Sequence, residues 1–210
     1  MKLYLAGGLT GNLNPLWRQG MRLYLAGLHS NWMKDCIDDM QVHVAQVFSY
    51  HNRVCEFYIQ DLLVLESFYY IKDWMIPYVR NMRFLLDSGA FTFMQNAKVK
   101  LDWDEYTERY AKFINKNKIE LLFELDIDSI VGIKEVERLR DKLETLTNRK
   151  CIPVWHKSRG KEYWINLCKT YDYIAIGGIV GGEIKTDEYR FFPTLLNIAQ
   201  AHNTKVHGLG

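Results

Sequence analysis

Short apolar segments alternate with amphipathic stretches along most of this chain, and this alternation constrains the fold more than any other feature. Strands that alternate with helices along a chain pair in parallel, because a parallel pair needs a long crossover connection. The pattern therefore predicts an α/β fold, built either as a (β/α) barrel or as an open doubly wound sheet. The predicted strands are Leu3–Ala6, Leu23–Ala26, Leu62–Ser67, Phe84–Asp87, Leu121–Asp126, Ile152–His156, Tyr173–Ile176 and Lys205–Gly208.

Three of the intervening stretches carry helix signals. The first follows Asp102, an N-cap residue with Glu105 three positions later, and repeats apolar residues at helical spacing. The third begins near Pro193 and ends at Ala201, with proline in the first turn where it is tolerated. The apolar faces comprise Trp103, Tyr106, Tyr110, Phe113 and Ile114 in the first helix, and Val136, Leu139, Leu143 and Leu146 in the second.

The segment LYLAG occurs twice, at residues 3–7 and 23–27. Its copies start 20 residues apart, whereas a strand-helix-strand unit needs roughly 30 residues. We therefore expect only one copy to be a strand of the main sheet. No linker rich in proline, glycine or serine divides the chain, so residues 1–210 are predicted to form a single domain.

Composition sets broad limits on the class of protein. A hydrophobic fraction of 48% and a charged fraction of 25% are ordinary for a globular domain, and a net charge of +2 gives only weak support for a polyanionic partner. The cysteines, Cys36, Cys55, Cys151 and Cys168, form no C-x-x-C pair, so neither a disulfide framework nor a zinc knuckle is predicted. The amino terminus has no signal-peptide pattern and no apolar run reaches membrane-spanning length, so we expect a cytoplasmic protein.

Polar residues collect where four of the predicted strands end. In parallel α/β folds this edge carries the active site, because the loops there vary on a rigid scaffold. In FLLDSGAF, residues 84–91, Asp87 leaves an apolar strand directly before Ser88 and two small residues. Such an acid can act as a general base, or it can form a turn or cap a helix.

The next two strand ends supply further polar groups. In LLFELDID, residues 121–128, alternation places Glu124, Asp126 and Asp128 on one face, where acids need a cation, a ligand or solvent. The alternative is that Glu124 pairs with an interior lysine or arginine and Asp128 caps the next helix, which leaves Asp126 for a ligand.

In IPVWHKSRG, residues 152–160, Trp155 and His156 could contact a base, and Lys157 and Arg159 could hold phosphate. A core tryptophan and an internally bonded histidine are the alternative.

The fourth strand end is YIAIGGIVGGE, residues 173–183. Gly177 and Gly178 directly after a strand expose backbone groups to a ligand, and Gly181 and Gly182 keep the following loop open. The glycine spacing is neither that of a dinucleotide fingerprint nor that of a phosphate-binding Walker A loop.

Taken together, four motifs resemble in order and spacing those of the tRNA-guanine transglycosylase family (queuine tRNA-ribosyltransferases). Residues 87–91, DSGAF, resemble the family's DSGGF segment, and Leu125-Asp126 resembles the strand with its base-binding aspartate. Residues 177–183, GGIVGGE, resemble its GG-x-x-x-GE loop, and residues 207–210, HGLG, are similar to its M-G-x-G. The resemblance covers residues 84–210 and is closest to short phage-type members that resemble DNA deazaguanine transglycosylases.

The resemblance implies a TIM-like (β/α)8 barrel that exchanges guanine in tRNA or DNA for a 7-deazaguanine, in the cytoplasm of a bacterium or a phage-infected cell. Asp87 would be the catalytic acid/base and Asp126 would bind the purine edge. The other base-binding residues would be Ser88, Asp128, His156, Gly177, Gly178, Ile179 and Glu183, with Lys157 and Arg159 on phosphate. A homodimer is compatible with this prediction, and no membrane partner or bound metal is expected.

Two departures from the family pattern matter. Where the family reads V-Q-G-G, this chain has Val154-Trp155-His156-Lys157, so the usual glutamine contact is replaced. The family's nucleophilic aspartate follows M-G-x-G on the last strand, with structural zinc ligands later still. We therefore expect a barrel that lacks its last strand, with unpaired edges on its first and last strands, no cofactor within the chain, and any structural zinc beyond Gly210.

Two other functional classes remain open at this point. One is a non-catalytic barrel subunit that binds nucleic acid or a partner. The other is a generic phosphosugar or metal-dependent barrel enzyme that uses Glu124, Asp126 and His156.

Overall fold

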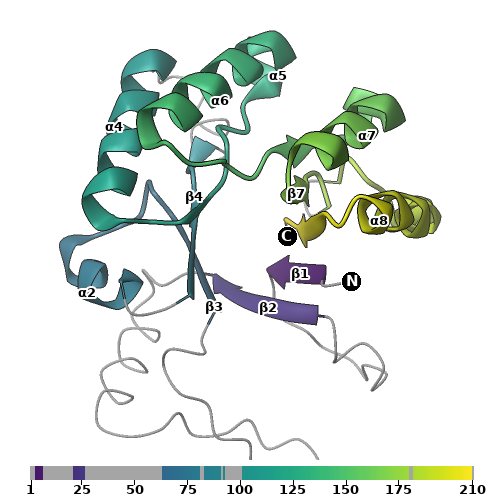
Figure 1. Ribbon diagram of the computed structural model, residues 1–210, viewed down its shortest axis with the longest axis horizontal. Coiled ribbons are helices and arrows are strands. Elements are labelled where there is room, and N and C mark those ends of the chain that lie inside the picture. The colour runs from purple at the N-terminus through teal and green to yellow at the C-terminus, as the bar shows by residue number, and fades with distance from the viewer. Residues whose placement is uncertain are drawn as a thin grey trace, which may run out of the picture.

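The computed structural model describes residues 3–6, 21–26, 63–80, 83–90, 92, 101–179 and 182–209 (Figure 1). Its strands are β1 (Leu3–Ala6), β2 (Met21–Ala26), β3 (Leu63–Ser67), β4 (Arg83–Asp87), β5 (Leu121–Leu122), β6 (Val154–Trp155), β7 (Tyr173–Ile176) and β8 (Lys205–Gly208). Its helices are α2 (Ile76–Val79), α4 (Trp103–Asn117), α5 (Asp128–Val131), α6 (Ile133–Thr147), α7 (Gly160–Thr170) and α8 (Phe192–Ala201). Short 3-10 helices are η3 (Asp73–Met75), η4 (Lys157–Arg159) and η5 (Thr186–Phe191).

Every strand pairing in the described part of the chain is parallel, as the alternating pattern predicts. The strand order is β5-β4-β3-β2-β1-β8-β7-β6. A further parallel bridge joins Phe123, after β5, to Ile152, before β6. The protein is therefore an α/β protein with parallel sheets.

Both copies of LYLAG form strands, so the prediction that only one would do so is wrong. β1 pairs in register with β2, Leu3 opposite Met21 and Ala6 opposite Tyr24. The length expected for a strand-helix-strand unit assumes that a helix connects the two strands. Strand pairing itself requires only two extended segments whose backbone N–H and C=O groups are available to each other. β1 also pairs with β8, Leu3 opposite Val206, so the first and last strands are not the unpaired edges that we expected.

The predicted strands at 121–126 and 152–156 are shorter in the structure. After Leu122 the chain changes its pairing partner: Phe123 N donates to Leu86 O at 2.9 Å, while Glu124 N donates to Ile152 O at 3.1 Å. The end of β5 therefore lies between β4 and the segment that leads into β6.

The helices follow their sequence signals closely. Asp102 caps α4, with Oδ1 accepting from Asp104 N at 2.9 Å and from Glu105 N at 3.1 Å. In α6, Leu143 is fully buried, whereas Leu146 is 43% exposed and lies off the buried face, contrary to our prediction. The third predicted helix is α8, which begins one residue before Pro193 and ends at Ala201.

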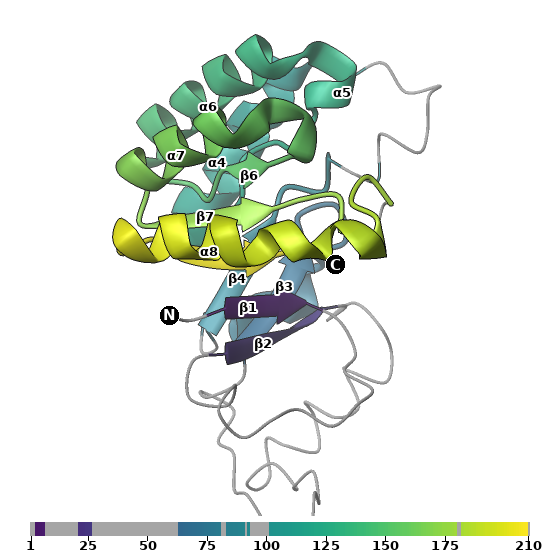
Figure 2. The same cartoon turned by 90° about the vertical axis from the view of Figure 1, so that its right-hand side faces the viewer.

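Two groups of helices cover the strands. α4 packs against α6 over one apolar cluster, and α7 packs against α8 over another, as Figures 1 and 2 show. A third cluster brings together Tyr24, Leu85, Phe123, Ile152, Val154 and Ala175 from β2 and from the segments of β4 to β7. The hydroxyl of Tyr110 on α4 donates to the carbonyls of Leu86 (3.1 Å) and Phe123 (3.2 Å), which fixes α4 to two neighbouring segments.

Cys151 and Cys168 are buried free thiols, whereas Cys36 and Cys55 lie outside the described residues, as do the motif residues Phe91, Val180, Gly181 and Gly210. Within the described ranges, no helix is both long and apolar enough to cross a membrane.

Candidate functional site

The four strand-end motifs meet at one edge of the structure. Because the strands are parallel, the residues that follow their carboxyl ends lie on the same side. Asp87 ends β4, Asp126 follows β5, His156 follows β6 and Gly177 follows β7.

His156 is the centre of this edge. Its Nε2 lies 2.8 Å from Asp126 Oδ1 and 3.0 Å from Asp126 Oδ2, and its Nδ1 lies 2.6 Å from Glu183 Oε2. Ser158 N donates to the other oxygen of Glu183 at 3.3 Å. The imidazole therefore joins the loop after β7 to the end of the β5 segment.

The two carboxylates change the protonation of this ring. Burial opposes the charged imidazolium, but the hydrogen bonds to Asp126 and Glu183 outweigh it and raise the pKa of His156 to about 9. His156 is thus positively charged at neutral pH, with both ring nitrogens donating.

The paired glycines provide the space that His156 and Glu183 occupy. A Cβ at Gly177 would lie 2.6 Å from His156 Cε1, and a Cβ at Gly178 would lie 2.6 Å from Glu183 Oε2. Gly178 also has a φ of +74°, which favours glycine. Ile184 N donates to Gly178 O at 3.1 Å and holds the loop against the strand end.

Arg159 lies among the strand-end acids. Its Nε is 3.0 Å from Asp128 Oδ2, its Nη1 is 3.4 Å from Glu124 Oε1, and its Nη2 is 3.7 Å from Asp126 Oδ1. The side chain is only 4% exposed. Arg159 therefore supplies the cation that the acidic face needs, and its enclosure by carboxylates does not fit the predicted phosphate role.

Lys157, the other residue predicted to hold phosphate, has its Nζ in an ion pair with Glu188. Its side chain is more exposed than that of Arg159. Any contact of Lys157 with a phosphate competes with this pair.

Glu124 occupies the deepest position of the site. It is fully buried, its Oε1 accepts from Val154 N at 2.7 Å, and its Oε2 pairs with Arg140 Nη1 at 3.2 Å. Burial raises the pKa of Glu124, and the guanidinium groups of Arg140 and Arg159 oppose that rise. The alternative in which Glu124 pairs with an interior cation is confirmed.

Arg140 itself was missed in the sequence. It lies four residues after Val136 and three before Leu143, within the buried stripe of α6. A charged residue at such a position is the signal that could have identified it, because a buried cation needs a buried partner.

Asp87 has a different environment from the other acids. Its Oδ2 accepts from Gly89 N at 3.0 Å, and no ion pair to a basic side chain is found for it among the described residues. Burial raises the pKa of Asp87 to about 6, against the Gly89 hydrogen bond, and the charges of Asp126 and Glu66 add to the rise. Glu66, which is buried near the end of β3, was also missed in the sequence. Like the strands that carry the four motifs, β3 is apolar and ends in polar residues.

Two predicted base-binding residues are turned toward the interior. Ser88 is buried, its Oγ accepts from Ala90 N at 3.4 Å, and its carbonyl accepts from the Tyr106 hydroxyl at 2.6 Å. The Ile179 side chain packs on the apolar cluster of α7 and α8, so only its backbone can serve a ligand.

Three side chains at this edge could also hold a metal ion. Oxygen atoms of Asp126 and Asp128 and a ring nitrogen of His156 all lie within 4.8 Å of one another. Glu183 on the opposite ring nitrogen is the partner that metal-binding histidines usually have. Arg159 places a positive charge beside the same two carboxylates, which disfavours a cation there.

Comparisons with models of protein families, with curated proteins and with solved structures give no match for this chain.

Proposed function

We propose that this protein is a base-exchange transglycosylase that replaces guanine in nucleic acid with a 7-deazaguanine. The observation that carries the proposal is that Asp87, Asp126, His156 and the loop containing Gly178 and Glu183 converge on one strand edge. These are the residues that the motif resemblance assigns to base binding and exchange.

Asp87 has the protonation behaviour that base exchange requires. Breaking the bond between the anomeric carbon and the base needs a proton for the leaving base, and attack by the incoming base needs that proton removed. With a pKa of about 6, Asp87 can both give and accept a proton near neutral pH.

The surrounding groups suit a guanine-like ring. Asp126 can accept from ring N–H and amino groups, and His156, whose two N–H groups are bonded to Asp126 and Glu183, holds these carboxylates in place. Backbone groups of Gly178 and Ile179 flank the same edge, since they directly follow β7. Trp155 stands at the position of the glutamine in the family pattern, and its indole N–H donates to Gly160 O at 2.8 Å.

The other strand-end carboxylates of the site are paired with cationic side chains. Glu124 and Asp128 are each held by an arginine, and Asp126 is shared between His156 and Arg159. Asp87, for which no ion pair is found among the described residues, is therefore the acid that we assign to proton transfer.

For the scaffold we infer a (β/α)8 barrel. The support is that each strand except β5 pairs with the next in sequence, that β1 pairs with β8, and that one isolated bridge, Phe123–Ile152, joins the segments next to β5 and β6. A barrel places its catalytic groups at the carboxyl ends of the strands.

The test is exchange of radiolabelled guanine out of DNA and out of tRNA in the presence of a 7-deazaguanine. The wild-type chain should release label from one of the two nucleic acids. Asp87→Asn should abolish release, while Asp141→Asn, at an exposed position on α6, should not. No release from either nucleic acid, with a folded protein, would overturn the proposal.

A metal-dependent enzyme is the second candidate, and the grouping of Asp126, Asp128 and His156 favours it. Calorimetry with Zn²⁺, Mn²⁺ and Mg²⁺ decides between the two. Binding that is lost in Asp128→Asn would support the metal enzyme, and absence of binding would reject it.

A further inference from the structure

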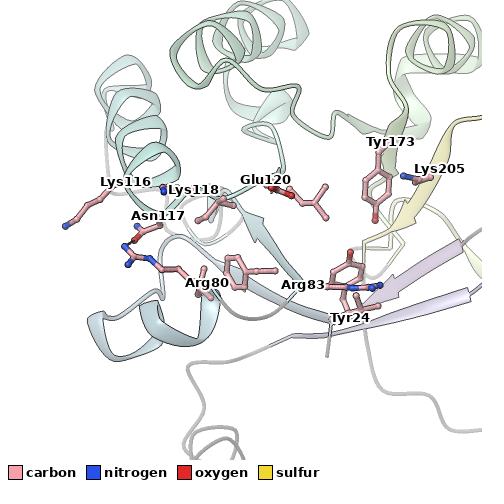
Figure 3. A pocket seen from close by; sticks show the side chains of 14 residues that line it. Tyr24, Arg80, Arg83, Lys116, Asn117, Lys118, Glu120, Tyr173 and Lys205 are labelled. Carbon is pink, nitrogen blue, oxygen red and sulfur yellow. Dashed lines mark hydrogen bonds between the residues drawn. The ribbon is translucent and has the colours of Figure 1, made fainter. Parts of the chain in front are cut away.

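A second concave site lies at the opposite ends of the strands. It is a cavity of about 650 Å³ whose walls include the first residues of β3, β4, β5, β7 and β8 (Figure 3). The candidate catalytic edge is formed by the carboxyl ends of the same strands, so the two sites lie at opposite edges. The lining residues used below are Tyr24, Arg80, Arg83, Lys116, Lys118, Glu120, Tyr173 and Lys205.

The cavity concentrates positive charge. Five of its lining side chains are cationic and one is acidic, in a chain whose net charge is only +2. Within the described ranges none of the five cations has an ion pair; Arg80 donates to the amide oxygen of Asn117 at 3.3 Å. All five cations are exposed, so a ligand can contact them without breaking an internal salt bridge.

Helix stability accounts for only part of this charge. Lys116 and Lys118 lie at the carboxyl end of α4, where cations favour the helix dipole. Arg83 and Lys205 begin strands β4 and β8, where no such effect operates. Their presence on the same cavity wall therefore calls for another explanation, and an anionic ligand provides it.

Aromatic rings form the part of the wall nearest to Arg83 and Lys205. In Figure 3, Tyr24 lies beside Arg83, and Tyr173 lies across from them beside Lys205. Both tyrosine rings pack edge-on against the buried His207, at centroid distances of 5.6 Å and 6.3 Å, and the Tyr173 hydroxyl lies 3.2 Å from His207 Nδ1. The rings are thus held in place before any ligand arrives.

His207 adds an unsatisfied polar atom behind this wall. The residue is fully buried, and its Nε2 has no hydrogen-bond partner in the part of the chain that the structure describes. Burial lowers the pKa of His207 to about 4, so the ring is neutral at pH 7. A neutral ring does not add to the charge of the cavity, which therefore depends on the arginines and lysines.

We propose that this cavity binds a nucleoside polyphosphate, with the phosphates on Arg83 and Lys205 and the base against Tyr173, whose ring is only partly buried, while the buried Tyr24 forms the floor beside it. The volume falls in the range of small-molecule sites, which run from about 300 to about 1,000 Å³. A concave pocket of that size suits a compact anion better than the backbone of a duplex. Guanidinium and ammonium groups are the usual phosphate ligands, and tyrosine faces accept a stacked base.

The experiment is calorimetry of the full chain with ATP and GTP, each compared with inorganic tripolyphosphate, with the unphosphorylated nucleosides and with a short single-stranded oligonucleotide. We expect a nucleotide to bind more tightly than tripolyphosphate and the nucleosides to bind weakly. Arg83→Gln or Lys205→Gln should each weaken nucleotide binding about tenfold, since each removes a charge-assisted hydrogen bond. Both positions are exposed, so neither substitution should impair folding.

Charge-matched controls are Lys161→Gln and Lys169→Gln on α7, made singly so that each removes one charge; both lysines are exposed and lie outside the cavity. These substitutions should leave binding unchanged. Equal affinity for tripolyphosphate and nucleotide, binding of the oligonucleotide alone, no binding, or equal losses in the control and cavity variants would each overturn the proposal.

Discussion

His156 Nε2 lies 2.8 Å from Asp126 Oδ1, and the opposite ring nitrogen lies 2.6 Å from Glu183 Oε2, so one imidazole is held between carboxylates from two separate strand ends. This relationship fixes the charge of the site and the position of the loop after β7. It also gives the site a defined response to pH.

The first prediction concerns that response. The pKa of His156 is about 9 in the folded protein against an ordinary value of 6.5, so the stability from its two ion pairs is fully present below pH 6.5. It is lost as pH rises through 9, and the loss should be on the order of 2 kcal/mol. Thermal melts between pH 6 and pH 10 and an NMR titration of the ring measure it. His156→Gln should flatten this part of the pH profile, and an imidazole that titrates near 6.5 would contradict the arrangement.

The second prediction concerns Asp87. Because its folded pKa is about 6 against an ordinary 3.8, its ionisation costs stability as pH rises from 3.8 to 6, and the cost persists above that range. Asp87→Asn should therefore raise the free energy of unfolding at pH 8 by about 1 kcal/mol and leave it unchanged at pH 3.5. Urea unfolding at the two pH values provides the measurement. A variant that is less stable at pH 8 would show that the carboxylate is not strained by burial.

The third prediction compares two arginines on α6. Arg140→Met removes the Nη1 that pairs with the buried Glu124 at 3.2 Å and should cost about 3 kcal/mol of stability. Arg138→Met removes an exposed arginine paired with Asp104 and Glu135 and should cost far less, because solvent screens exposed ion pairs. Chemical denaturation of both variants decides the matter, and equal costs would mean that Glu124 does not depend on Arg140.

The fourth prediction concerns Gly177, which packs against the imidazole of His156. Gly177→Ala would place a Cβ 2.6 Å from His156 Cε1, so the ring must move and the pKa of His156 should fall toward 6.5. Gly132→Ala is the control: its φ of +80° makes the substitution strained, but among the described residues no atom outside its chain neighbours lies within 4 Å of the added Cβ. It should reduce stability without changing the titration of His156. NMR titration of His156 in both variants tests the difference, and an unaltered pKa in Gly177→Ala would contradict the packing described.

The gathering of the strand-end acids could be anticipated, but their partners could not. Alternation along residues 121–128 indicated that Glu124, Asp126 and Asp128 share one face. In the structure Arg159, 31 to 35 residues further on, approaches all three, although the sequence suggested that it would bind phosphate. A cation on a loop can meet a ligand or an internal acid, and only the path of the chain decides which.

By itself, the sequence determined the features that depend on neighbouring residues. These include α4 with its Asp102 cap, the limits of β7 and β8, and the order of the strand-end motifs, because capping and hydrophobic periodicity act over a few residues. Tertiary structure alone decided the pairing of β1 with β8, the enclosure of Arg159 and the basic cavity behind Arg83 and Lys205. Each joins segments far apart in the chain, and their contacts depend on packing of the whole sheet, which no local pattern encodes.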